Sequence, residues 1–82
     1  MTVAPHFQFQ NNTLHAEQVP LNKLAEEFGT PLYVYSASSI KEAYRAYADA
    51  CEGLAQVTIC YAVKANSNIH ILKTLAVEGA GF

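Results

Sequence analysis

Thr58-Ile59-Cys60-Tyr61-Ala62-Val63-Lys64-Ala65-Asn66 is the stretch that decides the fold of this 82-residue chain. Residues 57–63 are nearly all apolar and β-prone, which is typical of a strand buried on both faces in a parallel sheet. Because side chains alternate along a strand, this one has a small face and a bulky face. The small face carries Thr58, Cys60, Ala62 and Lys64, and the bulky face carries Ile59, Tyr61 and Val63.

Lys64 is the candidate catalytic residue, at the end of this strand. If the strand belongs to a (β/α)8 barrel, its small face points inward and leaves room for a molecule beside the lysine. Active sites of such barrels lie at the carboxyl ends of the strands. A poorly solvated lysine there is an amine nucleophile that forms a Schiff base. The structural alternative is a lysine whose stem packs while its amine reaches solvent. The strand pattern alone does not decide between them.

The N-terminal part of the chain predicts a hairpin and a helix. Residues 6–10 alternate apolar and polar with period two, Asn11-Asn12 supplies turn residues, and residues 13–16 form the return strand. Pro20 suits the first turn of a helix, and Gly29 ends that helix.

A short strand and the longest helix are predicted next. Residues 32–35, Leu-Tyr-Val-Tyr, are β-prone and predict the strand. Ser39 and Glu42 form a capping-box signature at the start of the helix, and Gly53 stops it. The apolar stripe of this helix consists of Ile40, Ala43, Tyr44, Tyr47, Ala48, Cys51 and Leu54.

The C-terminal part predicts one more helix and the opening of one more strand. Asn66-Ser67-Asn68 supplies loop and N-cap residues for a helix over residues 69–78, with Ile69, Leu72 and Ala76 on one face. Gly79 ends that helix, and residues 80–82 open a strand. Alternating strands and helices indicate a parallel α/β unit. A domain rarely ends where a strand begins, so we expect the N-terminal piece of a longer protein.

Composition excludes several classes of protein. Five Lys and Arg and a net charge of −2 argue against a nucleic-acid or anionic-membrane footprint. No apolar run approaches the ~18 residues of a membrane span, and the first residues lack the pattern of a signal peptide. Two cysteines are too few for a disulfide scaffold. The three histidines lack metal-ligand spacing, so no metal is expected. We therefore expect a cytoplasmic α/β protein.

Tyr61-Ala62-Val63-Lys64-Ala65-Asn66 matches the cofactor-lysine motif of the fold type III pyridoxal-phosphate decarboxylases. Residues 28–36, Phe-Gly-Thr-Pro-Leu-Tyr-Val-Tyr-Ser, resemble the segment before the first long helix in the diaminopimelate branch of this family. Residues 11–17 with 19–21 resemble its N-terminal lead-in, and residues 79–82 resemble the start of its next barrel strand. The resemblance covers nearly the whole chain, in order.

The resemblance implies an alanine-racemase-like (β/α)8 barrel. A complete barrel needs about 250 residues, so residues 36–82 would be only its first part. Residues 1–35, the hairpin, helix and strand, would associate with a β-rich second domain. Lys64 would be the catalytic residue that bonds to pyridoxal 5'-phosphate. Ala62, on the same strand face, would lie close to the cofactor ring.

The resemblance also implies a reaction for the full-length protein. It is decarboxylation of meso-2,6-diaminopimelate to L-lysine and CO2, the last step of bacterial lysine biosynthesis, by a homodimer. The 82 residues alone would be inactive. A decarboxylase of ornithine, arginine or carboxynorspermidine stays open, because the substrate-reading residues are not among these motifs. A non-catalytic pyridoxal-phosphate-binding relative and a separate structural module also stay open.

Overall fold

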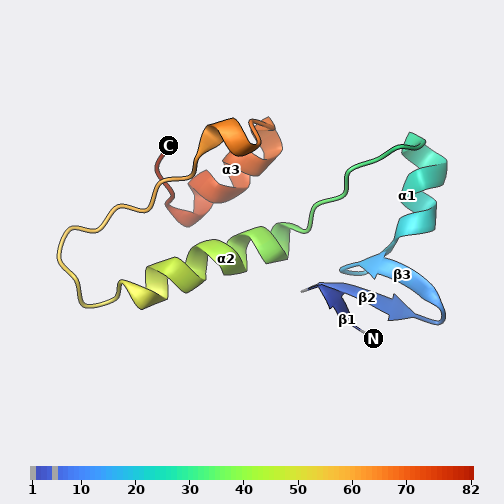
Figure 1. Cartoon of the computed structure of the whole chain (residues 1–82), viewed down its shortest axis with the longest axis horizontal. Coiled ribbons are helices and arrows are strands. Elements are labelled where there is room, and N and C mark those ends of the chain that lie inside the picture. The colour runs from blue at the N-terminus through green and yellow to red at the C-terminus, as the bar shows by residue number, and fades with distance from the viewer. Residues whose placement is uncertain (1, 5) are drawn as a thin grey trace. The chain divides into compact units, whose positions relative to one another are not determined.

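The computed structural model describes residues 2–4 and 6–82, and Figure 1 labels their helices and strands. The chain divides into two compact units, Met1–Ser39 and Ile40–Phe82. In the part of the chain that the structure describes, no helix has the length and apolar character needed to cross a membrane.

The first unit is built on an antiparallel sheet with the strand order β1-β2-β3-β4. Its strands are β1 (Thr2–Ala4), β2 (Phe7–Gln10), β3 (Thr13–Ala16) and β4 (Val19–Pro20). Strands β2 and β3 pair in continuous register, and the turn residues Asn11 and Asn12 have φ angles of 51° and 62°. Asparagine tolerates this left-handed backbone, so the predicted hairpin is confirmed together with its turn. The flanking strands β1 and β4 were not predicted.

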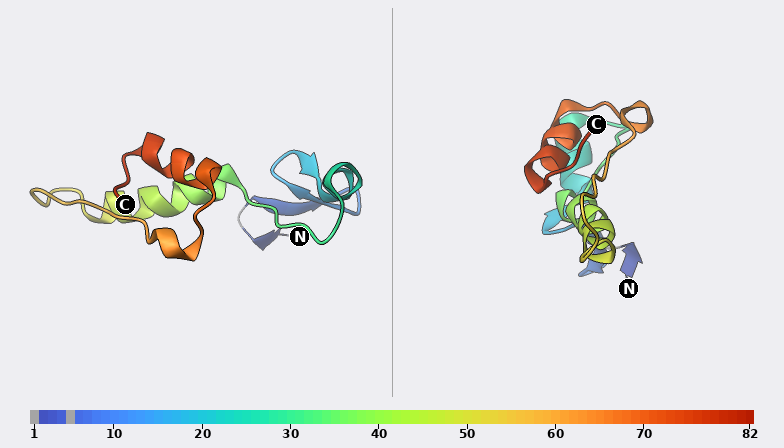
Figure 2. Two further views of the ribbon diagram at one scale, coloured as in Figure 1. Left: turned by 90° about the horizontal axis from the view of Figure 1, so that it is seen from above. Right: turned by 90° about the vertical axis from the view of Figure 1, so that its left-hand side faces the viewer.

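Helix α1 (Leu21–Phe28) follows the sheet directly. Pro20 is its N-cap residue, and Gly29, at φ 81°, donates its N–H to the Ala25 carbonyl at 2.8 Å. Figure 2 shows α1 beside the sheet, where it contacts β3 and β4. The predicted helix and its glycine stop are confirmed.

The strand predicted at residues 32–35 is wrong. These residues follow a cis Thr30–Pro31 peptide and form neither strand nor helix. Tyr33 is 86% exposed. β-prone side chains favour a strand only where a neighbouring strand can pair with it. No such neighbour lies beside residues 32–35 among the described residues.

Helix α2 (Ala37–Ala50) begins two residues before the predicted cap. The capping residue is Ser36, whose Oγ accepts the Ser39 N–H at 3.1 Å, so the prediction of Ser39 as the cap is wrong. Ser36 is 3% exposed and precedes the helix, as an N-cap must. The predicted apolar stripe is buried only in part: Ile40, Tyr44, Ala48 and Cys51 are half-buried, whereas Tyr47 and Leu54 are exposed.

Helix α3 (Ile69–Glu78) has the predicted bounds, with Asn68 as its N-cap and Gly79 at φ 106° as its end. The structure buries Ile71 and Leu75 and leaves Ile69, one of the residues predicted to share a face, 70% exposed. Except for Val77, the apolar side chains of the helix span a wide arc opposite the polar residues His70, Lys73, Thr74 and Glu78, and Ile71 and Leu75 lie at one edge of that arc while Ile69 lies toward the other. Arg45 of α2 forms an ion pair with Glu78 at 2.5 Å. Figures 1 and 2 show α3 alongside α2.

The stretch of residues 57–63 is only partly a strand. Cys60 and Gly81 form a parallel bridge, in which Tyr61 N–H donates to the Gly81 carbonyl and Gly81 N–H to the Ile59 carbonyl, each at 2.9 Å. The predicted parallel pairing with the next strand is therefore confirmed at this point. Burial on both faces is wrong, because within the described residues nothing covers the small face.

Candidate cofactor site

Lys64 lies in a turn that follows the bridged stretch. The turn is the 3-10 helix η1 (Val63–Ala65), closed by a 3.0 Å hydrogen bond from the Ala65 N–H to the Ala62 carbonyl. The expectation that Lys64 is the last residue of a strand is therefore wrong, because Lys64 lies within this short turn. The side chain of Lys64 is exposed.

The predicted alternation of side chains is visible in their burial. The bulky residues Ile59, Tyr61 and Val63 are half-buried, and the small-face residues Thr58, Cys60, Ala62 and Lys64 are exposed. Ala62 and Lys64 are both exposed, and their placement on one side of the stretch stays a prediction. This exposed face bears only small groups between Thr58 and the lysine.

Gly81 extends this small face onto the neighbouring segment. A Cβ at residue 81 would lie 3.0 Å from the Cys60 Sγ and 3.4 Å from the Thr58 Cγ2. Because Gly81 has no side chain, its backbone can approach residues 58–60 this closely. A primary amine beside a surface without large side chains fits the covalent attachment and the flat ring of pyridoxal phosphate. The roles of Lys64 and Ala62 in holding it remain predictions.

Tyr61 and Phe82 support the turn from the bulky side. The Tyr61 hydroxyl donates to the Asn66 carbonyl at 2.9 Å, and its ring meets the Phe82 ring edge to face, with centroids 6.5 Å apart. Beyond the turn, Asn66 Oδ1 accepts the Asn68 N–H at 3.0 Å, and Asn68 Oδ1 accepts the His70 N–H at 2.9 Å. The sequence pattern predicts no contact of Tyr61 with the turn. Its place on the bulky face, three residues before the lysine, is the signal that was available.

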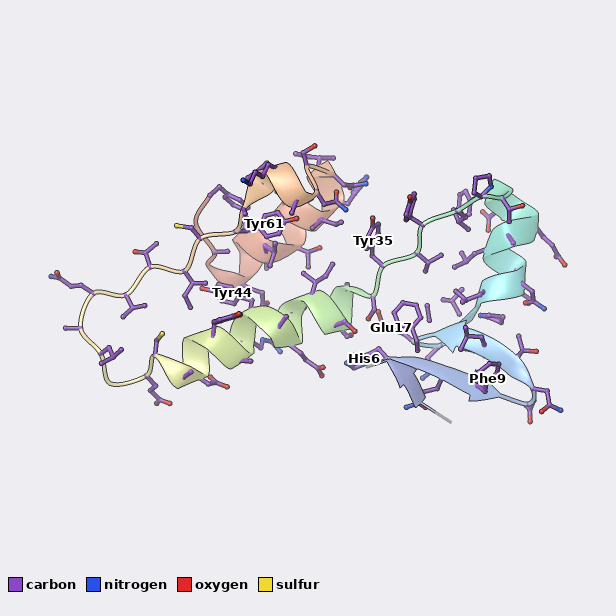
Figure 3. The ribbon with its side chains drawn as sticks, viewed as in Figure 1. His6, Phe9, Glu17, Tyr35, Tyr44 and Tyr61 are labelled. Carbon is purple, nitrogen blue, oxygen red and sulfur yellow. The ribbon has the colours of Figure 1, made fainter. Side chains whose placement is uncertain are left out.

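A second organised polar cluster lies in the first unit. The Glu17 carboxylate accepts hydrogen bonds from the hydroxyls of Ser36 at 3.0 Å and Ser38 at 2.8 Å. These two donors hold the pKa of Glu17 below its ordinary value, Ser38 more than Ser36. Figure 3 shows Glu17 next to the segment that enters α2. This cluster fixes the start of α2.

Comparison with known proteins identifies the chain. Residues 37–82 match the family described as pyridoxal-dependent decarboxylase, pyridoxal binding domain. The chain belongs to this family. Its relatives are more specific: a diaminopimelate decarboxylase of Pseudomonas aeruginosa is 53% identical over 76 residues, 93% of this chain. One of Neisseria meningitidis is 54% identical over 70 residues, 85% of this chain.

A solved structure agrees with these relatives. A crystal structure from Aquifex aeolicus superimposes with a TM-score of 0.85 at 48% identity, over 94% of this chain. The chain spans about 18% of the Pseudomonas relative and of the Aquifex structure, and 17% of the Neisseria relative. The described fold therefore matches a limited part of the length of these proteins.

Proposed function

We propose that these residues serve a pyridoxal-phosphate-dependent decarboxylase that converts meso-2,6-diaminopimelate to L-lysine and CO2. The observation that carries the proposal is the exposed Lys64 amine, at the end of a parallel-bridged stretch whose small face has room for a flat ring. The diaminopimelate decarboxylases that match 85–93% of the chain support this substrate over ornithine, arginine or carboxynorspermidine.

Each site residue has a distinct role in this proposal. Bound pyridoxal phosphate supplies a ring that takes up the electron pair left when CO2 departs. Lys64 holds the cofactor through its amine and, once its amine is freed by the substrate, moves a proton to or from the reacting carbon. Ala62 leaves room for the ring, because it places only a methyl group on the small face between Cys60 and Lys64.

The proposal includes the surroundings of the site. Residues 36–82 form the first part of a (β/α)8 barrel, and residues 1–35 associate with a β-rich second domain in a cytoplasmic homodimer. The parallel bridge to Gly81 supports the barrel, because strands of a barrel pair in parallel. Exposed apolar side chains in the first unit, among them Phe28, Tyr33 and Tyr35, support the contact with a further domain.

The test is chemical trapping of the cofactor on the full-length protein. The protein is treated with pyridoxal phosphate and borohydride, and the adduct is located by intact mass and peptide mapping. We expect one adduct, on Lys64, and none in Lys64→Met. Lys73→Met, which removes an exposed lysine of α3, is the matched control and keeps the adduct. An unchanged adduct in Lys64→Met would overturn the assignment of Lys64.

Release of CO2 tests the substrate. Full-length protein is expected to turn over meso-diaminopimelate faster than ornithine, arginine or carboxynorspermidine, and Lys64→Met is expected to turn over none of them. Preference for another of these amino acids would replace diaminopimelate, and an adduct without turnover of any would indicate a non-catalytic relative. The 82 residues alone are expected to be inactive, because they span about 18% of the enzymes that they resemble.

A further inference from the structure

The turn that carries Lys64 is enclosed by one side chain. Tyr61 precedes the turn, Asn66 follows it, and the hydrogen bond from the Tyr61 hydroxyl to the Asn66 carbonyl spans the residues between them. The Lys64 backbone therefore lies inside a closed loop of six residues. In Figure 3 the Tyr61 side chain lies next to this turn.

Both ends of this loop are fixed to other parts of the unit. At the Tyr61 end, the backbone N–H bonds to the Gly81 carbonyl and the ring packs against Phe82. At the Asn66 end, the side chain accepts the Asn68 N–H, and Asn68 caps α3. The Tyr61 hydroxyl is the link that joins the two ends across the lysine.

We propose that Tyr61 is a positioning residue for Lys64, whose hydroxyl holds the turn so that the lysine amine meets the cofactor in one direction. The inference rests on the proposed function, because it assumes that Lys64 bonds to pyridoxal phosphate. Tyr61 belongs to the bulky face of the stretch, and its hydroxyl donates a hydrogen bond to the backbone carbonyl of Asn66. It acts through the backbone, and a short, stiff turn lowers the number of directions that the long lysine side chain samples.

The hydroxyl is the part of Tyr61 that packing does not explain. A phenylalanine would fill the same space and keep the edge-to-face contact with Phe82. The hydrogen bond adds a tether, and an intramolecular hydrogen bond of this kind changes an equilibrium by roughly twofold to tenfold. We expect an effect of this size on capture of the cofactor by the lysine.

The first experiment measures the tether itself in the cofactor-free, full-length protein. Hydrogen exchange is followed by mass spectrometry on the peptide that covers residues 62–68, in the wild type, Tyr61→Phe and Tyr44→Phe. Tyr44 is a half-buried tyrosine of α2 in the same unit, so its variant loses a hydroxyl far along the chain from the turn. We expect exchange in residues 62–68 to become roughly twofold to tenfold faster in Tyr61→Phe alone. Unchanged exchange in Tyr61→Phe would overturn the proposal.

The second experiment measures positioning. The rate at which added pyridoxal phosphate becomes borohydride-reducible on Lys64 is compared in the same three proteins, together with their melting temperatures. We expect Tyr61→Phe to slow this rate by roughly twofold to tenfold, with a melting temperature like that of Tyr44→Phe. A wild-type rate in Tyr61→Phe, or equal slowing in both variants, would overturn the positioning role. Failure of the wild type to form the Lys64 adduct would instead overturn the proposed function, and this inference with it.

Discussion

Residues 7–16 and residues 57–63 are both β-prone, but the first region forms a continuous ladder and the second a single bridge. In the hairpin, four residue pairs from Phe7↔Ala16 to Gln10↔Thr13 are in register. In the second region, Cys60 pairs with Gly81, and the chain then turns into η1. Only two residues separate the paired strands of the hairpin, whereas the residues between Cys60 and Gly81 include the whole of helix α3.

The two regions differ in the sequence distance between paired residues, which is short for the antiparallel hairpin and long for the parallel bridge. An antiparallel strand needs only a tight turn, and Asn11-Asn12 supplies it. A parallel strand needs a crossover of a dozen or more residues and is stable when strands and helices cover both its sides. The first region therefore depends on local interactions, and the second depends on residues distant in sequence.

The largest expected effect lies at Ser36, which joins Glu17, the residue just after the hairpin, to the start of α2. Ser36→Ala removes the acceptor of the Ser39 N–H and a hydrogen bond to Glu17 inside a buried position, so we expect a loss of about 2 kcal/mol in the free energy of unfolding. Urea denaturation measures it. Ser38→Ala removes only the more exposed bond to Glu17 and is the control, with a smaller expected loss. Equal losses would contradict the capping role of Ser36.

The next effect tests the bridge in the second region. Gly81→Ala places a Cβ 3.0 Å from the Cys60 Sγ, so we expect a loss of about 1 kcal/mol from overpacking. The loss should shrink in a Cys60→Ala background, because the closest clashing atom is then gone. A double-mutant cycle by urea denaturation measures this coupling. Additive losses would mean that Cys60 and Gly81 do not meet.

A pH dependence follows from the Glu17 cluster. Hydrogen bonds lower the pKa of Glu17 in the folded protein below its ordinary value of 4.5. The charged carboxylate therefore stabilises the fold at pH values above 4.5, and this stability is lost as the pH falls through the lowered pKa. Glu17→Gln should therefore be destabilising at neutral pH and approach the wild type in acid. Because the side chain is exposed, the effect should be smaller than that of Ser36→Ala.

Melting temperatures at a series of pH values measure the Glu17 effect. Glu26→Gln, on the exposed side of α1, is the matched control for removal of one carboxylate. A difference between Glu17→Gln and the wild type that persists unchanged in acid would contradict the ionic role of Glu17.

The smallest expected effect tests the backbone conformation of the hairpin turn at Asn12. Asn12 has φ 62°, and Asn-Gly is the preferred sequence of two-residue turns with this backbone. Asn12→Gly should therefore raise the free energy of unfolding by a few tenths of a kcal/mol, and Asn12→Ala should lower it. Thermal unfolding of both variants measures the sign. A gain in Asn12→Ala would show that the turn is not under this backbone constraint.

The parts of the fold that were predictable are those whose signals are local. Paired asparagines define the hairpin, Gly29 and Gly79 end their helices, and Asn68 caps α3. The start of α2 is less predictable, because Ser36 and Ser39 both suit a cap and the contact that favours Ser36 comes from Glu17, nineteen residues earlier. The strand expected at residues 32–35 failed for lack of a partner, which propensity does not reveal.

The candidate site was predictable as a motif and less so as geometry. The predicted alternation of bulky and small residues from Thr58 to Val63 agrees with their burial, whereas a shared side for Ala62 and Lys64 stays a prediction. The turn around Lys64 was not predicted, because β-prone residues continue to Val63 and the sequence carries no glycine or proline there. The Tyr61 bond to a backbone carbonyl was also beyond sequence reasoning, since any of several carbonyls lies within reach of a tyrosine.

The backbone of Glu17 has a consequence for engineering this chain. At φ 56° the residue has a left-handed conformation that costs a residue other than glycine about 1 kcal/mol. Glycine would remove that cost but would also remove the acceptor of the buried Ser36 hydroxyl. Aspartate tolerates the backbone better, yet its carboxylate is one methylene shorter. No single exchange improves both properties, so a stabilising library should vary residue 17 together with residues 36 and 38.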